Sequence, residues 1–351
     1  MSRNKVAANT VVFRKLESIL IGDVSGLAVG PRWIKTNPFE QNSLINASID
    51  CRETCLPGKT AFAISLNSKS IFALPESPTT HSLPFMNGIT GQVNDAGLLT
   101  AIWAEPETKV KDIPDIASIL ANNIFGRKHE YGLDEVVDYF QDISLWEADP
   151  NTYPTTLPGS IYRVYGGFLT VNQSINLSLP YLASTLTKIR QIFEQFSGCL
   201  IEEAVFRGLT ATHWDHAFLE FYRCIERLYS VPYIEKFRSN LSAIKHLDLN
   251  LWVSSALNWR PKEEDALVCI LNDLADRGLV IKLATVLSVN CSATPTDITN
   301  PVGKALYKVR NNIAHLRVNT NSVSIQWNIL IDIMCDVIID RYSAYRSMII
   351  P

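Results

Sequence analysis

The sequence has no long apolar run, few charged residues and no large excess of either charge. No stretch of 18 consecutive apolar residues occurs, so we expect no transmembrane helix. Arg14 and Lys15 lie where a secretory signal peptide needs an apolar segment, and we therefore expect a cytoplasmic protein. Charged residues make up 19% of the chain and the formal net charge is −3. These values exclude a nucleic-acid-binding field spread over the whole protein and leave only a local patch.

Cysteines are too scattered for a disulfide framework. The chain has seven, an odd number, which favours a reducing compartment. Cys51 and Cys55 form a C-R-E-T-C motif, but no second Cys or His pair lies nearby, so a zinc site is disfavoured. His213 and His216 could share one helix face as metal ligands. A helix N-terminus with Asp215 in its first turn is the favoured interpretation.

What the sequence does contain is enough apolar material for a large core. Hydrophobic residues make up 47% of the 351 residues, and the mean hydropathy is +0.06. This composition excludes a disordered chain, and the length suggests about two domains. The low share of charge leaves apolar surface to cover, which favours an oligomer.

The first half, residues 1–175, is predicted to be a β-rich domain. Turn signals such as Pro57-Gly58 and Asn67-Ser68 separate short apolar runs. Strands are expected over Thr10–Phe13, Ser18–Ile21, Thr60–Leu66, Ser70–Leu74, Leu98–Ala104 and Ile161–Val171. Helices are expected over Asp115–Ile124 and Leu133–Ile143, and Gly166-Gly167 is interpreted as a turn or bulge.

The second half, residues 176–351, is predicted to be an all-α bundle, which makes the fold class α+β. Apolar residues there recur with helical spacing in four separate segments. The stripes are Leu182, Leu186, Ile189, Phe193 and Phe196; Phe218, Phe221, Tyr222, Ile225 and Leu228; Ala266, Leu267, Ile270, Leu271 and Leu274; and Ile329, Ile333, Val337 and Tyr345.

One segment, residues 300–317, combines a helix-start signal with a polar, histidine-containing face. Asn300 can cap a helix and Pro301 suits the first helical position. At helical spacing one side carries Val302, Leu306, Val309, Ile313 and Leu316. The opposite side carries Lys304, Lys308, Asn311 and His315, with Arg310 on the flank. We expect the first set to be buried, so that an acidic residue at position 313 would unfold the bundle.

This segment is unusual in its charge. No Asp or Glu occurs between Ile298 and Ile331, whereas a solvated helix face normally mixes both signs. Four cations lie in it: Lys304, Lys308, Arg310 and Arg317. The pattern favours a phosphate-binding stripe over an ordinary solvated face.

The string Arg310-Asn311-Asn312-Ile313-Ala314-His315 resembles the R-x4-6-H motif of the HEPN superfamily, a helical bundle used by many bacterial ribonucleases. The longer string from Leu306 to His315 is similar to the version in large HEPN domains, where a polar residue follows the arginine. Phe221–Leu228 resembles the upstream helix that brings a polar or acidic residue near the site. A second pair, Arg207 and His213, fits the motif less well because Gly208 and Thr212 interrupt it.

The resemblance, which covers roughly residues 176–350, implies a metal-independent endoribonuclease without a cofactor. Cleavage by the RNA's own 2′-OH would leave 2′,3′-cyclic phosphate and 5′-hydroxyl ends. His315 is assigned as general acid or base, Arg310 as the phosphate clamp and Asn311 as a residue that orients His315. Lys304, Lys308 and Arg317 would bind the RNA backbone, with Glu226 and Arg223 as supporting residues.

Resemblance also implies a homodimer with a composite active site. On one ideal helix a spacing of five places Arg310 and His315 about 140° apart, so two copies around a two-fold axis would converge better than one. The implied biological role is a toxin or anti-phage, abortive-infection effector. The N-terminal domain would then respond to a trigger molecule, an antitoxin or a phage component, and no ligand is assigned to it.

Two alternatives remain open. One is an inactive HEPN scaffold that binds RNA or protein without cleavage. The other is a toxin–antitoxin component inhibited by a second protein or by modification at Tyr307.

Overall fold

The computed structural model describes residues 4–20, 31–75, 84–125, 128–171, 177–199, 201–238, 262–290, 295–315 and 325–349. These residues form two compact units, Met1–Tyr165 and Gly166–Pro351. The units divide within helix α5, Pro158–Val171, whereas the boundary expected at residues 175 and 176 lies outside the described residues. The first unit contains a sheet and the second is helical in its described part, so the fold class is α+β.

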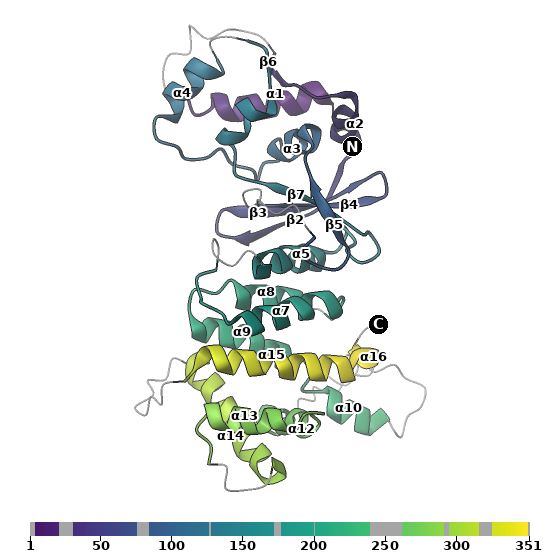
Figure 1. Cartoon of the computed structure of the whole chain (residues 1–351), viewed down its shortest axis with the longest axis vertical. Helices are drawn as coiled ribbons and strands as arrows, with labels where there is room; N and C mark the ends of the chain where they lie inside the picture. Colours follow the sequence, from purple (N-terminus) through teal and green to yellow (C-terminus); the bar gives the residue numbers. More distant parts are fainter. Residues whose placement is uncertain are drawn as a thin grey trace. The chain divides into compact units, whose positions relative to one another are not determined.

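The first unit is built on an antiparallel sheet of five strands in the order β2-β3-β4-β7-β5 (Figure 1). The strands are β2 Ser48–Leu56, β3 Lys59–Leu66, β4 Lys69–Leu74, β5 Ile89–Val93 and β7 Ser144–Ala148. Two short strands, β1 Trp33–Ile34 and β6 Glu130–Tyr131, pair in parallel. The remaining elements are α1 Lys5–Glu17, α2 Pro38–Asn46, α3 Ala96–Trp103, α4 Ile116–Asn123 and the 3-10 turns η1 Leu133–Glu135 and η2 Val137–Tyr139.

The hairpins β2–β3 and β3–β4 confirm the turn signals of the sequence. Gly58, Asn67 and Ser68 all adopt positive φ angles, of 71°, 51° and 65°, which suit tight hairpin turns. Strands β3 and β4 cover the segments expected over Thr60–Leu66 and Ser70–Leu74.

Alternating side chains of β3 and β4 pack on the two faces of the sheet. Phe62 and Ile71 join the cluster that contains Leu16 of α1 and Trp103 of α3, and Figure 1 shows both helices on one side of the sheet. The neighbouring Phe72 instead contacts the Tyr153 ring, 6.4 Å away between centroids. The sheet therefore has apolar side chains on both faces.

Three segments expected as strands are helices. Thr10–Phe13 lies in α1, Leu98–Ala104 overlaps α3 and Ile161–Val171 lies in α5 together with Gly166 and Gly167. All eight residues of α3 are buried, so its apolar run has no exposed face from which a period could be read. Side chains of Asn4 and Asp95 cap α1 and α3, accepting hydrogen bonds from the backbone N–H groups of Val6 and Leu98.

Two further predictions in this unit have different outcomes. The helix expected over Asp115–Ile124 is confirmed by α4. The helix expected over Leu133–Ile143 is replaced by η1 and η2, and residues 18–20 of the strand expected over Ser18–Ile21 form the turn that follows α1.

In the second unit the described residues form helices that bury the predicted stripes. The helices are α7 Ala183–Gln195, α8 Glu202–Leu209, α9 Trp214–Glu226, α10 Val231–Arg238, α12 Glu263–Asn272, α13 Gly278–Val286, α14 Pro295–Ala314, α15 Trp327–Ala344 and α16 Arg346–Ile349. Every member of the α9 and α12 stripes is buried, whereas Leu182 and Ile329 are exposed at the ends of α7 and α15. The stripes hold the bundle together by burying apolar surface.

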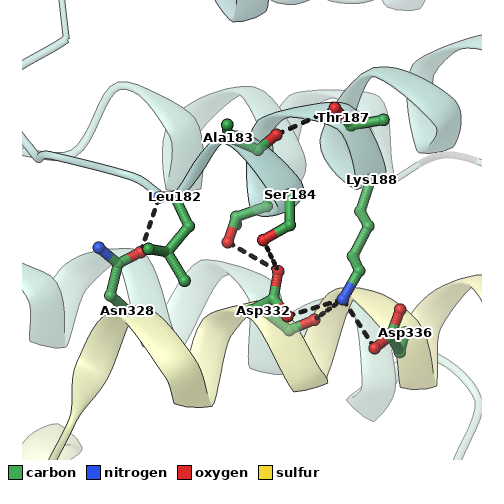
Figure 2. A network of polar contacts seen from close by, with 9 residues as sticks. Leu182, Ala183, Ser184, Thr187, Lys188, Asn328, Asp332 and Asp336 are labelled. Atoms are coloured by element: carbon green, nitrogen blue, oxygen red, sulfur yellow. Dashed lines mark hydrogen bonds and ion pairs between the residues drawn. The ribbon is translucent and has the colours of Figure 1, made fainter.

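A polar network joins α7 to α15 (Figure 2). Lys188 Nζ lies 2.7 Å from a carboxylate oxygen of both Asp332 and Asp336, and Thr185 and Ser184 donate hydrogen bonds to Asp332. Burial alone would raise the pKa of Asp332, but hydrogen bonds from Lys188 and Thr185 outweigh it and lower the pKa. The ionised form of Asp332 is therefore stabilised by folding.

Replacing Lys188 by methionine is expected to lower the free energy of unfolding by about 1–3 kcal/mol, because two partly buried carboxylates lose their cation. The difference from wild type should be largest near neutral pH, where Asp332 is ionised, and should shrink as the pH falls through the lowered folded pKa of Asp332. Urea unfolding at several pH values measures it. Arg207→Met, which breaks an exposed pair with Glu203, is the control; equal losses in both variants would contradict the prediction.

Candidate functional site

Helix α14 carries the motif and begins earlier than the sequence indicates. It starts at Pro295, so Asn300 is not its cap and Pro301 lies inside the helix. An internal proline removes one backbone hydrogen bond. The added turn buries Ile298 and lets Arg277 donate a hydrogen bond to the Thr299 hydroxyl at 3.1 Å, which offsets that loss.

The two faces of α14 differ as predicted along most of its length. Val302 and Leu306 are buried, whereas Lys304, Lys308 and His315 are exposed. Val309 and Ile313 were also expected in the core, but both are only half-buried. Leu316 and Arg317 lie outside the described residues.

Arg310 is held by a neighbouring helix. Its Nε donates to Glu226 Oε1 of α9 at 3.0 Å, and its second terminal nitrogen lies 2.9 Å from the same oxygen. Its other terminal nitrogen donates to Asn311 Oδ1 at 2.8 Å and lies 3.7 Å from Glu263 Oε2 of α12. Glu226, a supporting residue in the sequence-based prediction, therefore contacts Arg310 directly.

The surroundings of this ion pair affect both partners. Burial raises the pKa of Glu226 above its ordinary value, and the Arg310 charge only partly opposes the rise. Burial would lower the pKa of Arg310, but the carboxylates of Glu226 and Glu263 outweigh it and raise the pKa. The charges of the pair act on the buried Tyr222, whose hydroxyl lies 2.6 Å from that of Tyr229. The guanidinium thus stays charged and is fixed in orientation.

The other predicted site residues are arranged differently from the prediction. Asn311 was assigned to orient His315, but its side-chain oxygen accepts from Arg310, and the hydrogen bond to His315 runs between backbone atoms. The reason is geometric, because the Arg310 guanidinium lies within hydrogen-bond distance of the amide oxygen of its neighbour. Arg223 pairs with Glu220 on its own helix, and its charge also opposes the rise in the pKa of Glu226.

The cationic stripe faces acidic residues in space, although none lies near it in the sequence. Glu263 and Glu264 in the first turn of α12 lie 3.7 Å from Arg310 and from Lys304, respectively. Gly303 permits this close approach of the helices, since a Cβ there would lie 2.7 Å from Val268 Cγ2. Two cations of the stripe, Arg310 and Lys304, are therefore paired with carboxylates from another helix.

Sequence reasoning missed Glu263 and Glu264 as members of the site. Their acidic run directly precedes the apolar stripe that starts at Ala266, which marks it as the first turn of a helix. The sequence carries no signal that this turn contacts α14, because its partners Lys304 and Arg310 lie more than 35 residues further along the chain.

Metal-ligating clusters are absent from the described part of the chain, where no three His, Cys, Asp or Glu side chains gather suitably. His213 and His216 have ring centroids 5.8 Å apart at the start of α9, where His213 occupies the N-cap position. Cys55 lies in β2, and burial raises the pKa of its thiol to about 12.

The arrangement around α14 offers two chemically distinct groups. Arg310 is a fixed, forked cation that can bind a phosphate through its planar donors. His315 is an exposed imidazole five residues later, at the C-terminal end of the helix, which can exchange protons with a bound ligand.

Comparisons of the chain with protein-family models, with curated proteins and with solved structures found no match. Among the helices that the structure describes, none has the length and apolar character needed to span a bilayer.

Proposed function

We propose that the helical unit is a metal-independent endoribonuclease of the HEPN type. The observation that carries the proposal is the pairing of Arg310 on α14 with Glu226 on α9, with the exposed His315 five residues after Arg310. The HEPN resemblance implies an upstream helix that brings a polar or acidic residue near the site. The contact between α9 and α14 supports the proposal for this reason.

The proposed reaction needs only groups of the RNA and of this chain. The 2′-oxygen forms a bond to the adjacent phosphorus, the bond from phosphorus to the 5′-oxygen breaks, and a 2′,3′-cyclic phosphate results. His315 removes the 2′-OH proton or donates a proton to the leaving 5′-oxygen. Arg310 stabilises the additional negative charge on the phosphoryl oxygens. In a homodimer, His315 of one copy would act as base and that of the other as acid.

Lys304 and Lys308 would hold the RNA backbone along the exposed face of α14. Arg317 belongs to the same proposed stripe by sequence. The family resemblance extends the proposal to a toxin or anti-phage effector in the cytoplasm, with the N-terminal unit responding to a trigger, an antitoxin or a phage component.

Incubating the purified full-length protein with total RNA in EDTA tests the proposal. We expect cleavage that survives chelation and leaves 2′,3′-cyclic phosphate and 5′-hydroxyl ends, detected by end-specific labelling. Ends carrying a 5′-phosphate would contradict the 2′-OH mechanism.

One observation favours the second candidate, a HEPN-like module that binds RNA or protein without catalysis. Arg310 is already opposed by two carboxylates, Glu226 and Glu263, as a purely structural arginine would be. RNA binding without cleavage in the same assay would support this candidate.

A further inference from the structure

The acidic first turn of α12 contacts the cationic face of α14 at two separate points. Glu263 Oε2 lies 3.7 Å from an Arg310 terminal nitrogen, and Glu264 Oε1 lies 3.7 Å from Lys304 Nζ. Figure 1 shows α12 beside α14. Two carboxylates therefore occupy positions next to cations that RNA phosphates would contact.

These two contacts differ in kind from the contact with Glu226. The Glu226 carboxylate bonds Arg310 at 2.9 and 3.0 Å, and both side chains are about three-quarters buried. The Glu263 and Glu264 side chains are 45% and 38% exposed, and their separations are near the limit of an ion pair. Exposed, long pairs stabilise a fold little and are readily exchanged for other partners. Glu226 is thus suited to position Arg310, whereas the α12 carboxylates are suited to be displaced.

We propose that Glu263 and Glu264 compete with the RNA backbone for Arg310 and Lys304. RNA phosphates must displace the two carboxylates before they can contact these cations. The inference rests on the proposed function only in taking RNA as the ligand of this face. A phosphate competes well because it offers several charged oxygens to a guanidinium. The first turn of α12 then lowers the affinity of the cationic face for RNA. Binding there requires an RNA backbone whose phosphates can contact both Arg310 and Lys304.

The test compares RNA binding by the Glu263→Gln/Glu264→Gln double variant with binding by wild type, both carrying His315→Ala to prevent cleavage. Fluorescence anisotropy with a labelled single-stranded RNA of about 20 nucleotides gives the affinity at salt concentrations between about 50 and 200 mM. We expect binding about three- to tenfold tighter at the lowest salt. The slope of log affinity against log salt should steepen by up to about one for each freed cation.

A matched control removes the same charge from other helix starts. Glu203 and Asp215 lie in the first turns of α8 and α9, so Glu203→Gln/Asp215→Asn changes the net charge and the helix-end electrostatics equally. The single variants at 263 and 264 serve if the double variant fails to fold.

Equal tightening in the test and control variants would overturn the inference, because net charge alone would then explain it. A lower melting temperature with unchanged RNA affinity would also overturn it and would assign the acidic turn to helix stability. Absence of RNA binding in every variant would do the same. The cleavage assay judges the proposed function separately, since tighter binding by the variant without any wild-type cleavage leaves the competitor role intact in a non-catalytic module.

Discussion

Replacing His315 by alanine is expected to abolish RNA cleavage while leaving the fold unchanged. The imidazole is exposed at the end of α14, so its removal opens no cavity. Loss of a general acid or base lowers a rate typically by about 10²- to 10⁴-fold. Initial rates with a fluorescent RNA in EDTA and thermal melts followed by circular dichroism measure the two effects. RNA affinity should change little, because the stripe retains Lys304 and Lys308.

His216→Ala is the matched control, since it removes another exposed histidine of the helical unit. The role of Arg310 is better tested with Arg310→Lys than with Arg310→Ala, because alanine would leave the partly buried Glu226 without its cation. Lysine keeps the positive charge but lacks the forked donors of the guanidinium. We therefore expect Arg310→Lys to lose most of its cleavage rate while its melting temperature stays normal.

Two outcomes would contradict the His315 assignment. Full activity of His315→Ala, or equal losses in His216→Ala, would refute the assignment.

Replacing Leu306 by aspartate is expected to unfold the helical unit. Leu306 is buried on the inner face of α14, and an unpaired charge there costs more than about 4 kcal/mol, close to the whole stability of many domains. The same change at Ile313 should cost only about 1–2 kcal/mol, because that side chain is half-buried and the carboxylate can reach water.

Circular dichroism and gel filtration of the two variants measure this contrast on one helix. Leu306→Asp should show lost ellipticity or aggregation, and Ile313→Asp should retain a cooperative transition at lower temperature. The reverse order would mean that the orientation of α14 is wrong.

The stripes of the second half were predictable because each helix repeats its apolar positions independently of its neighbours. Phe218, Phe221 and Tyr222 lie on the buried side of α9, as their spacing predicts. The same reasoning failed for Leu98–Ala104, since a helix that is buried all round has no polar face to set its period. Likewise Pro301 signalled a helix start, but burial of Ile298 extends the helix past it.

For the candidate site, sequence alone determined which helix carries it and that Arg310 and Asn311 are adjacent on that helix. It also determined that Lys304, Lys308 and His315 are exposed. These are local properties, set by the helical repeat within a few residues. Only the tertiary structure decided that Glu226 holds Arg310, that Asn311 faces the guanidinium and that α12 brings two carboxylates to the cationic face. Those contacts join helices distant in the chain, and packing rather than local propensity determines which helices meet.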